Sequence, residues 1–429
     1  MMTETEARER LAVAVPANVR EVCRVLTVGG FQAVTVGGAV RDALLGRTPG
    51  DWDVATSARP EQVLASFRRT IPTGLQHGTV TVVTGRGADS HVEVTTFRGE
   101  GAYSDARRPD HVTFGVPLDE DLARRDLVVN AIAYDPEKRE LHDPFGGLAD
   151  LARRTLRAVG DPVARFTEDG LRVMRAVRFA AQLEFELAPD TEAGIPPALP
   201  SLARVSRERV CDELRKILGA RQPSRALAIA RRTGIVRSIL PELDAAIADE
   251  RAWLATVDRA PDTVRLAAML VVLADRTANV HRIDRLKLAS VLGLLRALKF
   301  SNVEADVAAQ LVATWQATSE AQWKPAEVRR LLADLDRDKR RLAVELWTAE
   351  AREPLAHEAQ RVLAAREPLA VGDLAVTGKD VMAALDLAPG PAVGRILAML
   401  VEYVLDDPAR NQRDALLRRA QQLELEVGH

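Results

Sequence analysis

Two kinds of hydrophobic pattern divide the chain. Between residues 31 and 143, short β-branched runs bounded by glycine predict strands, for example at 31–38, 78–85 and 91–97. Helical spacing lies between these runs, as at residues 60–69. From residue 151 onward, stretches rich in Arg, Leu and Ala repeat with the helical period almost to the end. The pattern therefore predicts a small α/β domain followed by a long all-helical region.

Proline-rich breaks and sheer length indicate several domains. The 429 residues exceed the size of one ordinary domain. The breaks favour an α/β head over residues 1–150, a helical neck over 151–240, a helical body over 241–365 and a helical tail over 366–429.

Composition narrows the class of protein. The 59 Lys and Arg residues nearly balance the 61 Asp and Glu residues. This balance excludes binding of nucleic acid through the net charge of the whole protein, but it does not exclude a local basic surface. Only seven residues are Lys, so nearly all positive charge comes from arginine. The guanidinium group can donate two parallel hydrogen bonds to a phosphate or a base edge, which lysine cannot. Cys23 and Cys211 are too few for a disulfide framework or a zinc site. With no apolar signal core near the start and no run long enough to span a bilayer, we expect a cytoplasmic protein without membrane contact.

The first candidate site is the sequence GGAVRD at residues 37–42. Gly37 and Gly38 end a predicted strand and precede a helix expected over 39–45. Bare backbone N–H groups at such a junction form an anion cradle, and Arg41 lies one turn further on. Two glycines before a helix are more often only a tight turn, so this signal gains weight from the carboxylates that come next in the chain.

These carboxylates lie within reach of the glycine turn. On a strand, Asp51 and Asp53 would point to the same side, where they could hold Mg²⁺ beside a triphosphate. Glu93 lies in the apolar strand run 91–97, and either completes this carboxylate cluster or faces water.

A second polar group precedes the apolar run at 127–135. Arg124 and Arg125 are suited to phosphate, whereas Asp126 and Asn130 can hold a ribose hydroxyl. The alternative is an ion-paired loop that only packs.

A third group lies on a predicted helix that Thr167 would cap. Asp169 and Arg172 are spaced to share a helix face, and Arg175 and Arg178 continue the stripe. An arginine beside an aspartate offers donors next to an acceptor, which matches the edges of cytosine and adenine but not those of uracil and guanine. The alternative is an ordinary surface salt bridge with solvated arginines.

These motifs, in this order, resemble the class II tRNA nucleotidyltransferase and poly(A) polymerase family. The likeness rests on GG-x-x-RD with D-x-D, RRD-x-x-x-NA, EDGLRVMR and SRERVCDEL, and it covers residues 31–218, with a weaker match at 377–397. It implies an α/β nucleotidyltransferase head with a mixed sheet, followed by an all-α neck, body and tail.

The resemblance also implies roles for single residues. Asp51 and Asp53 would hold two Mg²⁺ ions and act in catalysis. Glu93, a candidate because of its place in an apolar strand run and not because of the resemblance, is the third predicted catalytic residue. The nucleotide would be bound by Gly38, Arg41, Arg125, Asp126, Asn130, Asp169, Arg172, Arg175 and Arg178. Glu208, Arg209 and Glu213 resemble a motif that braces the base-reading helix.

The implied activity is addition of CCA to the 3′ end of tRNA from CTP and ATP, without a template. The segment at 71–83 resembles tRNA nucleotidyltransferases rather than poly(A) polymerases, and the segment at 97–110 resembles the flexible loop that terminal A addition needs. An enzyme that adds only A stays open, as do, further off, a CC-adding enzyme, a poly(A) polymerase and a non-catalytic RNA-binding protein. Candidate tRNA contacts in the tail are the turn at 388–395 with Lys379, Arg410, Arg413, Arg418 and Arg419.

Overall fold

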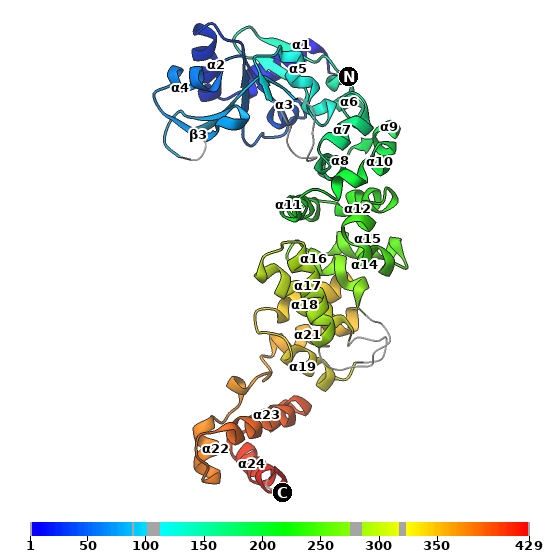
Figure 1. The fold of residues 1–429 in the computed structure, drawn as a ribbon. Coiled ribbons are helices and arrows are strands. Elements are labelled where there is room, and N and C mark those ends of the chain that lie inside the picture. The colour runs from blue at the N-terminus through cyan, green and yellow to red at the C-terminus, as the bar shows by residue number, and fades with distance from the viewer. Residues whose placement is uncertain (1, 88–89, 101–111, 275–284, 317–322, 428–429) are drawn as a thin grey trace. The chain divides into compact units, whose positions relative to one another are not determined.

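A computed structural model describes residues 2–87, 90–100, 112–274, 285–316 and 323–427. The chain forms two compact units, Met1–Asp244 and Ala245–His429. The first contains a mixed sheet with helices and then a helical segment, and the described part of the second contains helices and no strand (Figure 1). This agrees with the expected α/β head and all-α remainder, whereas the division into four domains stays a prediction.

The head is built on a seven-stranded sheet with the order β3-β4-β5-β2-β1-β8-β9. Its strands are β1 (Ala33–Val36), β2 (Asp53–Thr56), β3 (Thr70–Gly74), β4 (Thr79–Val83), β5 (His91–Thr96), β8 (Ala133–Asp135) and β9 (Glu140–His142). The β2–β5 pair is parallel and the other neighbouring pairs are antiparallel. Two short pairs stand apart from it, β6 (Arg98–Glu100) with β7 (Val112–Phe114) and β10 (Thr155–Leu156) with β11 (Glu186–Leu187).

The predicted strands at 31–38, 78–85 and 91–97 are confirmed as β1, β4 and β5. Two local predictions need correction. The helix expected over 60–69 ends at Ser66, because Phe67 is extended. The apolar run at 127–135 is not one strand: a 3₁₀ turn, η3 (Val128–Asn130), comes before β8, and it turns Asn130 away from the sheet ladder.

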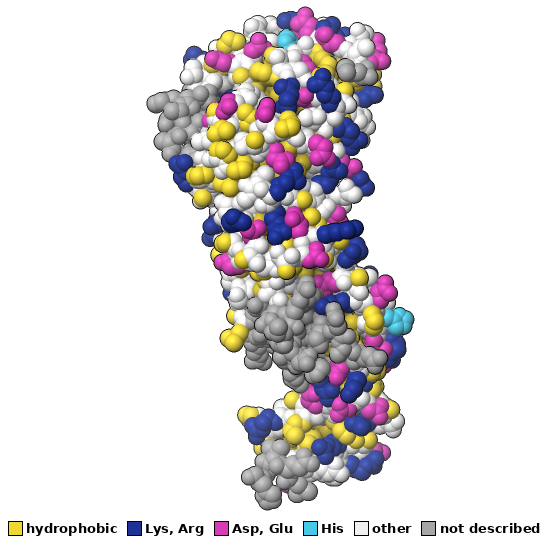
Figure 2. Space-filling model, turned by 90° about the vertical axis from the view of Figure 1, so that its right-hand side faces the viewer, with side chains coloured by type: hydrophobic (Ala, Val, Ile, Leu, Met, Phe, Trp, Pro, Cys, Tyr) yellow, Lys and Arg dark blue, Asp and Glu magenta, His cyan; other side chains and the backbone are white. Residues whose placement is uncertain are grey.

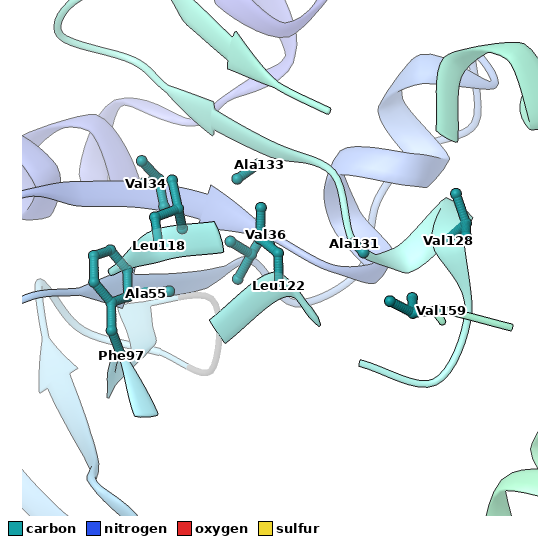
Figure 3. Packing of buried hydrophobic residues seen from close by; sticks show 10 residues of the cluster. All are labelled: Val34, Val36, Ala55, Phe97, Leu118, Leu122, Val128, Ala131, Ala133 and Val159. Atoms are coloured by element: carbon teal, nitrogen blue, oxygen red, sulfur yellow. The ribbon is translucent and has the colours of Figure 1, made fainter. Parts of the chain in front are cut away.

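The head also contains helices. They are α1 (Glu4–Ala14), α2 (Ala17–Val28), α3 (Gly38–Leu44), α4 (Pro60–Ser66), α5 (Leu118–Ala123) and α6 (Gly147–Arg153). Helices α2 and α4 contact each other and the central strands. Leu118 and Leu122 of α5 pack with Val34, Val36 and other buried side chains (Figure 3). This apolar core fixes β1 and β2, whose ends carry the Gly37–Gly38 turn and Asp53.

Helix α8 (Leu171–Leu183) is the central element of the helical segment in the first unit. The other helices of this segment are α7 (Pro162–Glu168), α9 (Pro189–Ala193), α10 (Ile195–Leu202), α11 (Arg207–Leu218), α12 (Pro223–Arg232) and α13 (Ile235–Ile239), and α14 (Pro241–Ala246) spans the boundary between the two units. Helices α10, α11 and α12 all pack on α8, and eleven of its thirteen residues are buried, including Arg172 and Arg178. Arginines on such a helix face protein or a ligand site rather than open solvent.

The second unit begins with α15 (Glu250–Arg259), α16 (Arg265–Leu270), the 3₁₀ turn η4 (Val271–Leu273), α17 (Arg285–Ala297) and α18 (Asn302–Gln316). It continues with α19 (Pro325–Ala333), α20 (Arg340–Ala349), α21 (Glu353–Ala364), α22 (Gly378–Leu385), α23 (Pro391–Asp406) and α24 (Arg413–Val427). Val381, Leu400 and Leu416 lie in a small apolar core shared by the last three helices. Thr377 caps α22 through a reciprocal pair of bonds with Asp380.

None of the helices in the described ranges is long and apolar enough to cross a bilayer. On the face shown in Figure 2, basic and acidic side chains are interspersed. This mixture agrees with the near balance of charge in the sequence.

Candidate active site

One cavity gathers most of the predicted site. It has a volume of about 540 Å³ and lies within the first unit, between the Gly37–Gly38 turn and helix α8. Ten of the predicted residues line it: Gly38, Arg41, Asp53, Arg125, Asp126, Asn130, Asp169, Arg172, Arg175 and Arg178. Asp51 and Glu93 do not. Seven arginines and three aspartates line the cavity, so its walls favour an anion.

The Gly37–Gly38 turn brings backbone close to the charged groups. Gly37 has φ +80°, a conformation that favours glycine. A Cβ atom on residue 37 would also lie only 3.3 Å from Arg125 Nη1 and 3.9 Å from an Asp53 carboxylate oxygen. Both observations explain why glycine stands here, and they place Arg125 and Asp53 beside the same turn.

The three carboxylate residues are exposed and lie near one another at β2 and β5. β2 begins at Asp53, so Asp51 lies in the bend before the strand rather than on it, which corrects the prediction. Asp51 is exposed, Trp52 buried and Asp53 exposed, so the alternation of a strand still extends back to Asp51. Asp53 and Glu93 are register partners in the parallel β2–β5 pair, and Glu93 is exposed as well.

Crowding of these carboxylates changes their chemistry. Partial burial, followed by repulsion from Glu93 and Asp51, raises the pKa of Asp53 to about 6, although Arg125 acts in the opposite direction. A carboxylate destabilised by neighbouring carboxylates is one that a divalent cation stabilises. Among the described residues, no three His, Cys, Asp or Glu side chains form a ready-made metal cage. The donors fit Mg²⁺, which usually takes one or two protein carboxylates and completes its shell with phosphate and water.

A chain of hydrogen bonds joins the head to helix α8. Arg41 Nη1 donates to Asn130 Oδ1 at 2.6 Å, and Asn130 Nδ2 donates to Asp126 Oδ1 at 3.0 Å. Asp126 Oδ2 accepts from Arg175 Nε at 2.7 Å. Burial opposes ionisation of Asp126, but the ion pair with Arg175 and the bonds from Asn130 and the Leu127 N–H outweigh it and hold its pKa low. Asp126 therefore stays charged and orients two groups that line the cavity.

Arg124 and Arg125 are oriented by an aspartate that belongs to none of the sequence motifs. The buried Asp121 accepts from Arg124 at 2.9 Å and from Arg125 Nη2 at 3.3 Å. Arg125 Nε is buried and bonds to nothing in the described parts of the chain. An unsatisfied guanidinium N–H at the cavity wall is suited to an anionic oxygen.

Asp169 and Arg172 do not form the helix-face pair that their spacing predicts. Thr167 is not a cap, because α7 runs through it to Glu168, and Asp169 stands between α7 and α8. The Asp169 carboxylate instead accepts from Arg209 at 2.7 Å, and Arg172 donates to Glu168 at 2.6 Å and to the Arg124 carbonyl at 3.0 Å. Both side chains still line the same cavity.

Arg178 is held by hydrogen bonds to two protein side chains. Its Nε donates to Glu213 of α11 at 2.6 Å, and its Nη1 donates to Gln182 at 2.8 Å. Helix α11, which carries Arg209 and Glu213, therefore contacts both ends of the predicted base-reading stripe. Phe179 also lines the cavity and was not among the residues predicted from the sequence. The available signal was an aromatic four residues after Arg175 in a stretch otherwise aliphatic and basic.

Two other predictions concern the segment at 97–110 and the tail. The proposed flexible loop at 97–110 lies mostly outside the described residues. In the tail, Arg413 pairs with Asp380 at 2.6 Å and Arg410 stacks on Tyr403. These contacts leave the predicted tRNA surface untested.

Comparison with known proteins agrees with this arrangement. Residues 33–157 match the family of the poly A polymerase head domain. Residues 184–247 match the family described as "Probable RNA and SrmB-binding site of polymerase A", and residues 282–420 match tRNA nucleotidyltransferase domain 2.

Full-length relatives extend the match over nearly the whole chain. The CCA-adding enzyme of Geobacillus thermodenitrificans is 40% identical over 402 residues, which cover 92% of this chain and 94% of the relative. The CCA-adding enzyme of Enterococcus faecalis is 36% identical over 396 residues, covering 92% and 93%. The solved structure of the Bacillus stearothermophilus CCA-adding enzyme in complex with CTP superposes with a TM-score of 0.73 at 33% identity, over 96% of this chain and all of that one. A Thermotoga maritima CCA-adding enzyme complexed with tRNA shares the fold, with a TM-score of 0.70 at 18% identity over 97% of this chain and 98% of that one.

Head, helical segment and remainder thus all match one kind of enzyme, and that family of nucleotidyltransferases is generally metal-dependent. The chain belongs to the CCA-adding enzymes, within the class II nucleotidyltransferase family.

Proposed function

We propose that this chain adds CCA to the 3′ end of tRNA from CTP and ATP, in the cavity between the Gly37–Gly38 turn and helix α8. What supports the proposal is that one cavity contains both a carboxylate suited to a metal ion and a wall of arginines suited to a triphosphate. Relatives named CCA-adding enzymes cover 92% of the chain, which favours full CCA addition over addition of A alone.

In the proposed reaction, the tRNA 3′-hydroxyl oxygen forms a bond to the α-phosphorus, and the bond to the bridging oxygen of pyrophosphate breaks. Two Mg²⁺ ions at Asp51 and Asp53 would polarise the phosphate and neutralise charge on the leaving oxygens. Glu93, as the neighbour of Asp53 across the β2–β5 pair, keeps that carboxylate poised for a cation.

The triphosphate would lie along the arginine wall. Arg125 offers its unsatisfied Nε, and Arg41, Arg175 and Arg178 are held in place by Asn130, Asp126 and Glu213 respectively. Gly38 lets the backbone approach the phosphates without a side chain in the way.

Asp169 and Arg172 would read the base. A guanidinium beside a carboxylate complements the acceptors and the amino group of cytosine and adenine. Because Asp169 is bonded to Arg209 and Arg172 to Glu168, reading requires these side chains to exchange those internal bonds for bonds to the base.

We place the enzyme in the cytoplasm, where tRNA is its substrate. Cys23 and Cys211 are both buried and are not joined in a disulfide, which fits a reducing compartment. Burial raises the pKa of the Cys23 thiol to about 12, so it is not a nucleophile.

Extension of three tRNAs tests the proposal. The tRNAs end at the discriminator base, at C and at CC, and each is given CTP, ATP or both. We expect the first to grow to full CCA. Extension only of the CC-ended tRNA, by ATP, would mean an A-adding specialist, and no extension at all would mean a binding protein.

Two variants assign the residues in the same assay. Asp53→Asn should lower kcat by at least about 100-fold, because it removes a charged metal ligand.

Arg172→Ala should lower the preference for CTP and ATP over UTP and GTP by about tenfold or more. Unchanged selectivity would show that the base is read elsewhere.

A further inference from the structure

Phe179 occupies an unusual place in the cavity wall. It lies on α8, is only 7% exposed, and has three arginines around its ring. The guanidinium carbons of Arg178, Arg41 and Arg175 lie 4.1, 4.9 and 5.5 Å from the ring centroid. One of these arginines comes from the head helix α3 and two come from α8 itself.

Three guanidinium groups around one ring repel one another in a partly dry site. Each has a carboxylate partner: Asp42 for Arg41, Asp126 for Arg175 and Glu213 for Arg178. A further carboxylate at position 179 would neutralise the wall, and an aliphatic side chain would leave the inner faces of the guanidinium groups without a favourable contact. A phenyl ring attracts cations through its quadrupole yet adds no net charge, so the wall stays positive toward the cavity.

The ring also closes a second connection between the head and helix α8. Arg41 and Arg175 are already joined through Asn130 and Asp126. Phe179 joins the same two arginines directly and adds Arg178. The three cations are therefore held at fixed positions on the cavity wall before any ligand binds.

We propose that Phe179 is a positioning residue that clamps Arg41, Arg175 and Arg178 as one triphosphate-binding unit. This inference rests on the proposed function, since it assigns the arginine wall to the phosphates rather than to the base. It predicts that weakening the ring weakens binding of any triphosphate, whatever its base, and leaves base selectivity unchanged.

The direct probe is inorganic triphosphate, titrated into the full-length chain alongside CTP and ATP. Phe179→Leu keeps an apolar side chain but removes the π face, and we expect all three affinities to fall together by about tenfold. The ratio of extension rates for CTP and ATP over UTP and GTP should not change. The matched control is Phe185→Leu: Phe185 is also buried and contacts one arginine, Arg154, but does not line the cavity. It should leave the triphosphate affinity unchanged.

A second series keeps the shape of the ring. Phenylalanine analogues with one, two and three fluorine atoms at position 179 weaken the quadrupole stepwise, and the affinity for inorganic triphosphate should fall stepwise with them. Unchanged affinity across this series, or an equal loss in Phe185→Leu, would overturn the inference. Because this binding experiment uses no tRNA, a failure of the chain to extend tRNA would contradict the proposed function while leaving the role of Phe179 separately testable.

Discussion

At the scale of single residues, the raised pKa of Asp53 couples the stability of the metal-free chain to its proposed chemistry. The folded-state pKa is about 6, above the ordinary value of 3.8. The protonated form is therefore favoured by folding, and this contribution is present below about pH 4 and lost as the pH rises through 6.

Asp53→Asn should consequently stabilise the metal-free chain while destroying its activity. We expect the melting temperature in EDTA at pH 8 to rise by about one to a few degrees, because the variant no longer forces a charge beside Glu93 and Asp51. The gain should vanish near pH 4, and Mg²⁺ should raise the melting temperature of the wild type alone. A variant less stable than the wild type at pH 8 would contradict this account of Asp53.

Gly170 is a second residue with a sharp expected effect. A Cβ atom there would lie 2.3 Å from backbone atoms of Ser201 and Leu202, so α8 could not begin where it does against α10. Gly170→Ala should lower the free energy of unfolding by about 1–3 kcal/mol or more, measured by urea denaturation. Gly293→Ala is the control, because a Cβ atom meets nothing within 4 Å in the middle of α17; it should be neutral or stabilise by up to about 1 kcal/mol. Equal effects in the two variants would show that the tight contact does not matter.

At the scale of elements, Arg329 joins α19 to the end of α23. Its guanidinium group is buried, donates to the carbonyls of Leu405 and Asp406 at 2.6 and 2.8 Å, and pairs with Glu367 at 3.1 Å. These carbonyls end a helix and would otherwise lack partners. Arg329→Met should cost about 1–3 kcal/mol of stability in the second unit, measured by urea denaturation.

The neighbouring Arg330 provides the matched control. It also bonds to α23, at Glu402 and Asp406, but these side chains are 41% and 50% exposed. Arg330→Met should cost less than about 1 kcal/mol. If the two substitutions cost the same, burial of the guanidinium group is not what makes Arg329 important.

Some helices and strands could be predicted from the sequence, and others could not. Strand runs bounded by glycine located β1, β4 and β5, because β-branched alternation is a local property. The helix start near Thr167 was wrong because α7 and α8 meet at Asp169–Gly170, and only Gly170 allows the close approach to α10 that sets this junction. Such a packing limit is not visible in local sequence.

The cavity residues could likewise be predicted from the sequence only in part. Motif order grouped Asp53, Arg125, Asn130 and Arg178, which do line one cavity. Their partners could not be predicted, since Asp169 bonds to Arg209 from forty residues away and Arg178 to Glu213 from thirty-five. Phe179 was not predicted because an aromatic on an amphipathic helix usually packs in the core, and only the positions of three arginines show its place in the site.

At the scale of the whole molecule, the cavity belongs entirely to the first unit, since its lining runs from Gly37 to Arg209. A fragment of residues 1–244 should therefore fold and bind CTP and ATP with affinities within about threefold of those of the full chain. It should extend tRNA poorly, because the second unit, which contains the predicted tRNA contacts, is missing. Calorimetric titration and the extension assay check both parts. A folded fragment without nucleotide affinity would show that the second unit contributes to the pocket.

The bonds already made by Asp169 and Arg172 have one more consequence. In the proposed role, any incoming base must compete with Arg209 and Glu168 for these side chains, so recognition is an exchange reaction rather than the filling of vacant positions. Cytosine and adenine return as many hydrogen bonds as they displace. Uracil and guanine would displace the same bonds, but they place an N–H group against the arginine donor and so form fewer hydrogen bonds than they displace. Their binding is therefore weaker than the internal bonds of Asp169 and Arg172. The internal bonds then compete with every incoming base. Weakening them, for example by Arg209→Lys, should make the choice of nucleotide less strict although Asp169 and Arg172 themselves are unchanged.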